Sequence, residues 1–281
     1  MKVCYTIQDL REHLASVRNT SKIGFVPTMG ALHQGHISLV QDSKMKADIT
    51  VASIFVNPAQ FNNSEDLEKY PRTLESDLAK LNSAGCDFVF VPEASEMYPT
   101  IPDIRIDLGT ITSELEGKFR PGHFNGVGLV VSKLFNIVQP HFSFFGQKDL
   151  QQFYVIKKLV DELNYSLELV MVATQRETNG LAMSSRNMRL SDSDKQEASL
   201  LYKALKEGQK RLLSTSDVTE TKTLVKELIG TSDRLQLEYF EVVQTTDFKP
   251  LELVQIKEKT ALCIAAEIGG VRLIDNLLLI S

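Results

Sequence analysis

The sequence predicts an α/β fold in which a Rossmann-like parallel sheet forms the N-terminal domain and a smaller α+β C-terminal domain follows. In the first two thirds of the chain, short β-branched runs alternate with longer segments of helical period, the pattern of a parallel sheet covered by helices. After Arg189 the composition shifts to helix formers, and three strand-like runs follow. The length of 281 residues also exceeds that of most single-core domains. We therefore predict two domains, residues 1–175 and 176–281.

Five runs in the N-terminal part have the residue content of strands. They are rich in β-branched and aromatic residues and span 23–27, 49–56, 87–92, 142–146 and 167–173. Helices are predicted over 74–84, which Gly85 ends, and over 124–138. Asp149 opens a third helical segment, in which apolar residues recur at spacings of three and four: Leu150, Phe153, Ile156, Val160 and Leu163. This helix and the last two strands of the set form a predicted βαβ unit.

The C-terminal part is predicted to begin with helices and to end in a hairpin. Ser191 and Asp194 provide an N-cap and an acidic first turn for a helix over 190–213, and a second helix is expected over 218–228. Gly269 and Gly270 suit a two-residue hairpin turn. They would join the last two of three expected strands, at 237–244, 261–268 and 271–279.

The composition excludes several classes of protein. Apolar residues make up 43% and charged residues 24% of the chain, which is ordinary for a globular protein. The 31 basic and 36 acidic residues give a net charge of −5 with no block of Lys or Arg, so no nucleic acid partner is expected. Cys4, Cys86 and Cys263 show no paired spacing, which fits a reducing compartment. Since no signal-like or membrane-spanning apolar run is present, we expect a soluble cytoplasmic protein with no membrane partner.

The segment PTMGALHQGH, Pro27 to His36, carries the strongest chemical signal. It lies between a predicted strand and a helix, and such a turn offers free backbone N–H groups to an anion. A P-loop is excluded because His36 and Ile37 stand where Lys and Ser/Thr are needed, and no GxGxxG follows any strand. His33 and His36 can both face a phosphate without a fixed charge, which fits nucleotidyl transfer. A capping pair of histidines is the structural alternative, and zinc is a weaker third one.

Two further polar blocks follow predicted strands. Asn57 and Gln60 would project from the carboxyl edge of the sheet, where open α/β sheets bind ligands, with a plain Asn-Pro turn as the alternative. Asp149 and Gln152 have the spacing of a capping box and could be purely structural. Lys148 opposes the dipole of the following helix unless an anion lies there too, which favours a binding role.

Two loops remain ambiguous on their residues alone. Met183 to Arg186, MSSR, offers two hydroxyls and a guanidinium that could close over a triphosphate or merely cap the next helix. Lys118, Arg120 and His123 lie in a Gly/Pro segment that is either anion-binding or a solvated loop.

PTMGALHQGH resembles the HIGH motif as it occurs in the pantothenate synthetase family of the nucleotidylyltransferase superfamily. Further blocks resemble this family in order and spacing: FVNPAQF, YPRT, KFRPGHFNGV, VSKLFNIVQP, FFGQKDLQQ and RETNGLAMSSRN. Ala173 and Gln175 depart from the Pro and Val usual there, and His141 departs from the usual Asp. None of these departures removes a candidate catalytic group.

The resemblance implies ATP-dependent condensation of (R)-pantoate with beta-alanine to pantothenate, AMP and pyrophosphate, through a pantoyl adenylate. It also implies Mg²⁺ with the ATP, a C-terminal domain that closes over the ATP site, and a homodimer. Gln60 and Gln152 match the family's substrate-binding positions, for pantoate and beta-alanine, and His36 matches the residue treated as its proton donor. The positions that match its ATP contacts are Met29, Gly30, Ala31, Leu32, His33, Gln34, Gly35, His36, Gly146, Gln147, Lys148, Asp149, Gln175, Met183, Ser184, Ser185 and Arg186.

Some details of the site stay open at this level. Protein ligands to the metal are unknown, with Asp77 a weak candidate, and Asp149 would accept ribose hydroxyls. The polar segment Asn62 to Lys69 is expected to be a mobile loop that closes over the intermediate. Two other functions are compatible with the histidine motif: a nucleotidylyltransferase acting on a phosphorylated acceptor, and a regulator that binds ATP without turnover.

Overall fold

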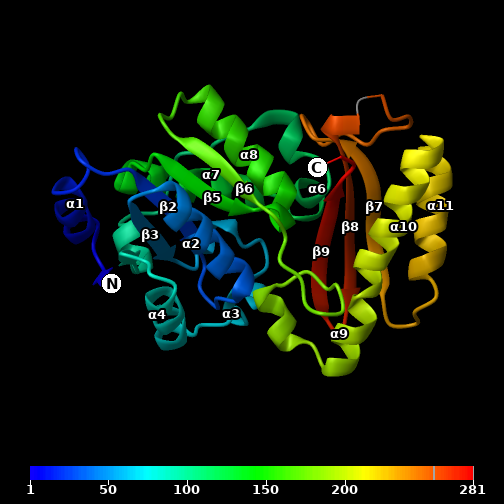
Figure 1. Ribbon diagram of the computed structural model, residues 1–281, viewed down its shortest axis with the longest axis horizontal. Helices are drawn as coiled ribbons and strands as arrows, with labels where there is room; N and C mark the ends of the chain where they lie inside the picture. The colour runs from blue at the N-terminus through cyan, green and yellow to red at the C-terminus, as the bar shows by residue number, and fades with distance from the viewer. Residues whose placement is uncertain (256, 281) are drawn as a thin grey trace.

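The computed structural model describes residues 1–255 and 257–280 and arranges them around two sheets (Figure 1). The larger sheet is parallel throughout and has the strand order β1-β4-β3-β2-β5-β6. Its strands are β1 (Lys2–Cys4), β2 (Ile23–Thr28), β3 (Ile49–Ile54), β4 (Phe88–Phe90), β5 (Phe142–Gly146) and β6 (Glu168–Val172). The five predicted strands are all present, and the Rossmann-like class is confirmed. The short edge strand β1 was not predicted.

Helices cover both faces of this sheet, so its strands are buried on both sides. On one face, Val26, Ala52 and Phe144 pack with residues of α2 (Gln34–Lys46) and α4 (Leu74–Ser83). On the other face, Phe25 and Phe145 pack with α1 (Ile7–Ala15), α7 (His123–Val138) and α8 (Leu150–Glu162). The helices predicted over 74–84, over 124–138 and after Asp149 are thus confirmed, and Gly85 at the end of α4 has the left-handed φ of 78° that favours glycine.

The strand order reverses direction between β2 and β5. From β2 the chain proceeds outward to β3 and β4, and then returns to place β5 on the other side of β2. In open α/β sheets, ligands bind outside the carboxyl ends of the strands at such a switch point. The carboxyl ends of β2 and β5 lead directly into PTMGALHQGH and GQKD, so the two strongest sequence motifs meet there.

Several short helices lie in the connections. They are α3 (Ser64–Glu68), α5 (Ala94–Met97), α6 (Glu116–Phe119), α9 (Asp192–Ala198) and the 3₁₀ turns η1 (Pro58–Gln60), η2 (Gly109–Thr112), η3 (Gln147–Asp149), η4 (Ser185–Arg189) and η5 (Lys257–Lys259). The expectation of a loop over Asn62 to Lys69 needs correction, because this segment contains α3. Asn63 caps α3 by accepting a hydrogen bond from the N–H of Glu65 at 2.8 Å.

The second sheet is antiparallel and has the order β7 (Gln236–Gln244), β8 (Thr260–Ile268) and β9 (Val271–Leu278). Gly269 and Gly270, with φ of 56° and 70°, form the predicted hairpin turn between β8 and β9. Helices α10 (Leu200–Thr215) and α11 (Val218–Ile229) cover its outer face (Figure 1). The helix predicted over 190–213 is divided at Ser199 into α9 and α10, while Ser191 caps α9 as expected.

The inner face of the second sheet continues the core of the large one. Val243, Ala261 and Cys263 belong to the same apolar cluster as α7 and α8. Between the sheets, β6 ends at Val172 and η4 begins at Ser185. The domain boundary near residue 175 stays a prediction.

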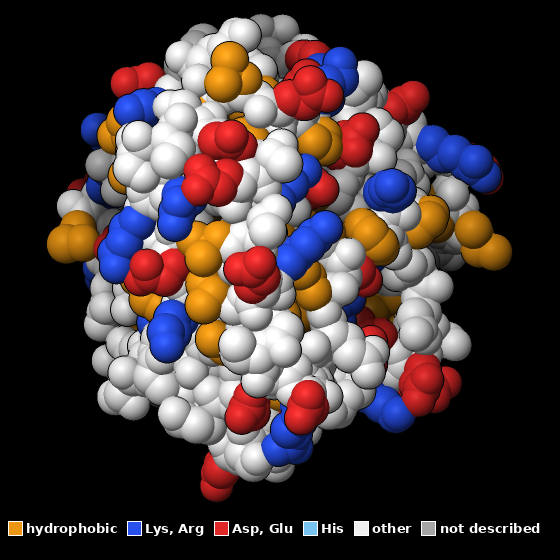
Figure 2. All heavy atoms as spheres, turned by 90° about the vertical axis from the view of Figure 1, so that its right-hand side faces the viewer, with side chains coloured by type: hydrophobic (Ala, Val, Ile, Leu, Met, Phe, Trp, Pro, Cys, Tyr) orange, Lys and Arg blue, Asp and Glu red, His pale blue; other side chains and the backbone are white. Residues whose placement is uncertain are grey.

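On the outer face around α10 and α11, basic and acidic side chains are interspersed, and that face has no broad basic patch (Figure 2). Of the helices that the structure describes, none combines the length and the apolar character required to cross a membrane.

A glycine lets two backbones meet beside the switch point. A Cβ atom on Gly126 of α7 would lie 2.1 Å from the carbonyl oxygen of Ala59 in η1. No side chain can therefore separate α7 from the turn that carries Gln60. The close approach fixes the position of Gln60 relative to α7.

We predict that Gly126→Ala lowers the free energy of unfolding by about 2–3 kcal/mol, because the new methyl group must push the two backbones apart. Gly128→Ala, two residues along the same helix, is the matched control. Its nearest atom would be Ile106 Cγ2 at 3.4 Å, so we expect a neutral or slightly stabilising effect. Urea unfolding of both variants would measure the difference, and equal effects would contradict the backbone contact.

Candidate active site

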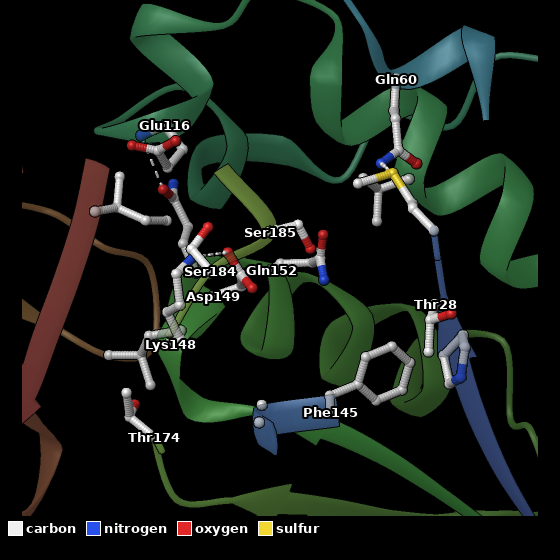
Figure 3. A pocket seen from close by; sticks show the side chains of 18 of the residues that line it. Thr28, Gln60, Glu116, Phe145, Lys148, Asp149, Gln152, Thr174, Ser184 and Ser185 are labelled. Atoms are coloured by element: carbon white, nitrogen blue, oxygen red, sulfur yellow. Dashed lines mark hydrogen bonds and ion pairs between the residues drawn. The ribbon is translucent and has the colours of Figure 1, made fainter. Parts of the chain in front are cut away.

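A cavity of about 240 Å³ opens at the carboxyl ends of β2 and β5 and is closed on one side by β9. Most of the residues predicted for ATP and pantoate line it together, although they come from separate parts of the sequence. Figure 3 shows Gln60 at one end and Lys148, Asp149 and Ser184 toward the other. The predicted residues that line this cavity are Met29, His33, Gly35, His36, Gln60, Gly146, Lys148, Asp149, Gln152, Gln175, Met183, Ser184, Ser185 and Arg186.

Asp77 shapes the turn that follows β2. This buried carboxylate of α4 accepts hydrogen bonds from the backbone N–H groups of Ala31 and Leu32, both at 2.8 Å. It also accepts one from the hydroxyl of Thr73 at 3.1 Å. Gly30 and Ala31 adopt left-handed φ values of 80° and 49°, so the chain reverses sharply at this point. Asp77 is therefore a structural anchor of the turn, and its candidacy as a metal ligand stays a prediction.

The two histidines of the motif cap the helix that follows them. His33 is the N-cap of α2, and its Nδ1 accepts from the N–H of Gly35 at 3.1 Å. His36 Nδ1 accepts in return from the N–H of His33 at 3.3 Å. Because both Nδ1 atoms accept, both rings carry their proton on Nε2. The capping interpretation was thus correct, and it leaves two N–H donors for a ligand.

Both imidazoles are neutral at physiological pH. Burial, and after it the positive charge of Lys148, lower the pKa of His33 to about 4. Burial lowers the pKa of His36 to about 3, and His33 contributes to this shift. The pair can therefore donate hydrogen bonds to phosphate oxygens but carries no positive charge there. No third ligand completes a metal cluster with them among the described residues, which leaves the zinc alternative without support.

The segment after β5 places the cation of Lys148 beside the carboxylate of Asp149. Asp149 stands at the N-cap of α8 but makes no side-chain cap hydrogen bond, so the structural capping box predicted with Gln152 is absent. Lys148 Nζ lies 3.4 Å from Asp149 Oδ1. Burial acts to raise the pKa of Asp149, but Lys148 and Arg186 outweigh it and hold this pKa below its usual value. Both side chains face the cavity (Figure 3), as the binding interpretation of Lys148 requires.

Gln60 is held from three sides at the apolar end of the cavity. Asn57 donates from Nδ2 to Gln60 Oε1 at 3.1 Å, and Tyr98 donates to Asn57 Oδ1 at 2.9 Å. His123 Nδ1 donates to the backbone carbonyl of Gln60 at 2.9 Å. Gln60 Nε2 lies 2.9 Å from the sulfur of Met29. An apolar wall follows, made by Phe124, Val127, Val130, Val131, Leu134 and Phe145.

The loop from Met183 to Arg186 crosses above the histidine turn and is tied to it. Ser185 donates its hydroxyl to the carbonyl of Ala31 at 2.9 Å and is buried. Arg186 forms an ion pair with Asp66 of α3, with Nη2 to Oδ2 at 2.7 Å. Burial acts to lower the pKa of Arg186, but Asp66 raises it above its ordinary value. The segment predicted to be a lid is therefore joined to the predicted phosphate-binding loop.

Five of the predicted ATP contacts do not line the cavity. The N–H groups of Ala31 and Leu32 are bonded to Asp77, and Gln34 is exposed at the start of α2. Gln147 donates to Asn276 Oδ1 at 3.4 Å instead. Direct contact with ATP stays a prediction for these positions: Gly30, Ala31, Leu32, Gln34 and Gln147.

Sequence reasoning missed the contribution of the C-terminal sheet. Tyr239 of β7 and Asp275 and Asn276 of β9 line the cavity. Asp275 is bound by Arg176 through contacts of 2.6 and 3.0 Å, and Asn276 Nδ2 donates to the carbonyl of Lys148 at 2.8 Å. The only sequence signal is the Asp-Asn pair that interrupts the mainly apolar strand β9, which otherwise has one charged residue, Arg272. Thr174 was missed as well; its buried hydroxyl has no hydrogen-bond partner among the described residues, so a ligand could satisfy it.

A parallel sheet with its switch point at an anion-receptive turn, two neutral histidine donors and an adjacent lysine defines a nucleotide-binding α/β protein. The model of the family described as Pantoate-beta-alanine ligase matches residues 2–278. The chain belongs to this family and is therefore a ligase.

Curated relatives and solved structures agree. Pantothenate synthetase of Cytophaga hutchinsonii is 48% identical over 277 residues, covering 98% of each chain. That of Carboxydothermus hydrogenoformans is 47% identical over 282 residues, covering 99% of each. The crystal structure of pantothenate synthetase from Thermus thermophilus superimposes with a TM-score of 0.93 at 38% identity, covering 99% of each chain. Pantoate-beta-alanine ligase from Francisella tularensis, complexed with beta-gamma ATP and beta-alanine, has a TM-score of 0.84 at 35% identity, covering 100% of this chain and 98% of that one.

We predict that Asp77→Ala lowers the free energy of unfolding by about 2–4 kcal/mol, since two buried N–H groups lose their acceptor. Activity should fall with it because the histidine turn loses its anchor. The half-saturating Mg²⁺ concentration should stay unchanged. Glu75→Ala, an exposed acidic residue on the same helix, is the control. A shift in Mg²⁺ dependence without loss of stability would instead support Asp77 as a metal ligand.

We also predict a stability loss in acid that depends on His36. In the unfolded state a histidine has a pKa of about 6.5. His36 has a pKa of about 3 in the fold, so below about pH 6.5 the unfolded state binds more protons, and stability falls as the pH falls through this window. His36→Gln should lose less stability than the wild type between neutral pH and about pH 4.5. Chemical unfolding at several pH values measures this, and parallel losses in the two proteins would refute it.

Proposed function

We propose that this protein condenses (R)-pantoate with beta-alanine at the expense of ATP, giving pantothenate, AMP and pyrophosphate. The observation that supports this most is the pairing of two sites in one cavity. A phosphate-receptive end with His33, His36 and Lys148 adjoins an end where a fixed amide, Gln60, stands before an apolar wall. Such a cavity suits a small hydroxylated acid with a branched apolar body, held beside a triphosphate.

The chemistry begins with activation of a carboxylate. A carboxylate oxygen is a poor leaving group, so the pantoate carboxylate would attack the α-phosphorus of ATP and release pyrophosphate. The amine of beta-alanine would then attack the acyl carbon of the pantoyl adenylate. A C–N bond forms, the C–O bond to AMP breaks, and a proton is released. No covalent bond to the protein is required.

The residues of this chain would act by position and electrostatics. We assign the Nε2–H groups of His33 and His36 as hydrogen-bond donors to phosphate oxygens. With pKa values of about 4 and about 3, both rings are neutral at neutral pH and are poorly suited to transfer a proton as general acids. Lys148 and Arg186 would supply the positive charge for the triphosphate. Gln60 and Gln152 would hold the hydroxyls of pantoate, and Asp149 would accept from ribose.

Mg²⁺ fits this site mainly as a companion of ATP. The carboxylates of Asp77, Glu116 and Asp275, in or near the cavity, are engaged by N–H groups or arginines. The triphosphate, held by Lys148 and Arg186, and water would therefore provide most of its ligands, which suits an ion that retains several waters. When bound, Mg²⁺ would neutralise charge on the triphosphate.

Three further features of the proposal depend on the family and the composition. We propose residues 1–175 and 176–281 as the two domains, with closure of the second over the ATP site, and a homodimeric assembly. Cys4, Cys86 and Cys263 are free and buried, which supports a reducing and hence cytoplasmic setting.

The decisive assay mixes the protein with MgATP, pantoate and beta-alanine and measures AMP and pantothenate. We predict that both appear in equal amounts, and that pyrophosphate and bound pantoyl adenylate form when beta-alanine is withheld. A nucleotidylyltransferase would need a phosphorylated acceptor, and a regulator would release no AMP. Pyrophosphate that appears only with beta-alanine would replace the two-step route by a concerted one.

A further inference from the structure

A second cavity, of about 510 Å³, lies beside the first and shares part of its wall. The junction between the two cavities consists of the residues that line both: Glu116, Arg120, Lys148, Asp149, Ser184, Arg186, Ile274 and Asp275. The wall of the second cavity beyond this junction carries charges of both signs: Lys69, Arg189 and Arg272 against Glu65, Asp66, Glu238 and Glu267. Such a mixed wall does not favour a polyanion, and it suits a zwitterion such as beta-alanine.

Most cations at this junction are already bound to carboxylates. Arg186 is paired with Asp66. Arg272 donates two hydrogen bonds of 2.7 Å to the carboxylate of Glu116, and it also binds Glu238. Lys148 contacts Asp149, and Arg176 binds Asp275. The carboxylates that line the junction therefore have their partners.

Among the described cations that line the junction, Arg120 has the longest contact with a carboxylate. Its nearest carboxylate oxygen is Glu116 Oε2 at 3.8 Å, beyond hydrogen-bond distance, and this oxygen already accepts from Arg272. The hydrogen bond that the structure gives Arg120 runs from Nη1 to His123 Nε2 at 3.2 Å. A guanidinium has five N–H donors, so most of its capacity is unused. Burial lowers the pKa of Arg120, and Glu116 offsets this only in part, so a bound anion would stabilise its charge.

The position of Arg120 indicates which anion it meets. His123 accepts from Arg120 on one ring nitrogen and donates to the carbonyl of Gln60 with the other. Arg120 thus stands on the Gln60 side of the cavity, where the acyl group would lie. The carboxylate of beta-alanine is two methylene groups from the attacking amine. A carboxylate held at the junction would aim that amine at the acyl carbon.

We infer that Arg120 binds the carboxylate of beta-alanine at the junction of the two cavities, by the bidentate geometry that arginine and carboxylate share. This assignment depends on the proposed function. It goes beyond it by naming the residue that would distinguish beta-alanine from other amines.

The test separates the two half-reactions in Arg120→Met. Pantoate-dependent exchange between ATP and pyrophosphate needs no beta-alanine, and we expect it to stay within about twofold of the wild type. The kcat/KM for beta-alanine should fall about 100-fold, the scale for loss of one partner of a buried charge pair. With 3-aminopropanol, which lacks the carboxylate, wild type and variant should react equally slowly. Lys118→Met is the control, because this exposed lysine of the same segment lines neither cavity.

Each other outcome has a defined meaning. If exchange falls together with pantothenate formation, Arg120 serves ATP or pantoate, and the inference is wrong. An unchanged kcat/KM for beta-alanine also overturns it. If the wild type forms no pantothenate, the proposed function fails instead. Should Arg120→Met fail to fold in a thermal melt, Arg120→Lys replaces it: the charge remains but the planar fork is lost, and the same split between exchange and beta-alanine use is required.

Discussion

Two hydrogen bonds to one buried carboxylate determine the shape of the site. Asp77 accepts hydrogen bonds from the backbone N–H groups of Ala31 and Leu32. These bonds stabilise a turn in which Gly30 and Ala31 adopt the left-handed conformation, which is unfavourable for Ala31. From that turn His33 begins α2, and against it Ser185 anchors the opposite loop. The anchor belongs to α4, which follows β3 in the chain, so the histidine end of the cavity is assembled only when the sheet and its helices have packed. Local sequence alone could not maintain it.

The sequence was informative where structure depends on neighbours along the chain and uninformative where it depends on distant partners. β-branched runs and the Gly-containing turn predicted β2, β3 and β5 and the motif at the switch point. The three-residue strand β1 is too short to give a periodic signal, and its pairing with β4 supplies what its own residues do not. Ser199 interrupts a strongly helical composition without Gly or Pro, so the division into α9 and α10 was not visible. No sequence pattern singled out Glu116, because its partners Tyr239 and Arg272 come from the C-terminal sheet, more than 120 positions along the chain.

Local rules also gave opposite results at the two helix starts of the cavity. His33 and His36 satisfy a capping box, and this structural duty is what directs their remaining N–H groups outward. Asp149 has the residue type and spacing of a cap but does not act as one, so its carboxylate faces the cavity, where Lys148 contacts it. The N-terminus of a helix at a candidate binding site can thus be well capped or poorly capped. A better indicator of binding is which side-chain polar atoms still lack a partner once the backbone N–H groups are hydrogen-bonded.

The backbone contact at Gly126 has a consequence for changing what the cavity accepts. Since α7 and η1 touch without intervening side chains, directed evolution cannot move Gln60 by exchanging a residue between them. The adjustable surface is the apolar wall on the same helix, where Val127, Val130 and Val131 contribute side chains. Selection for bulkier or smaller acids should therefore accumulate changes on this wall, while the polar end stays constant. In the proposed binding mode, the contacts to the hydroxyls are thus separate from the contacts that set the size of the acid.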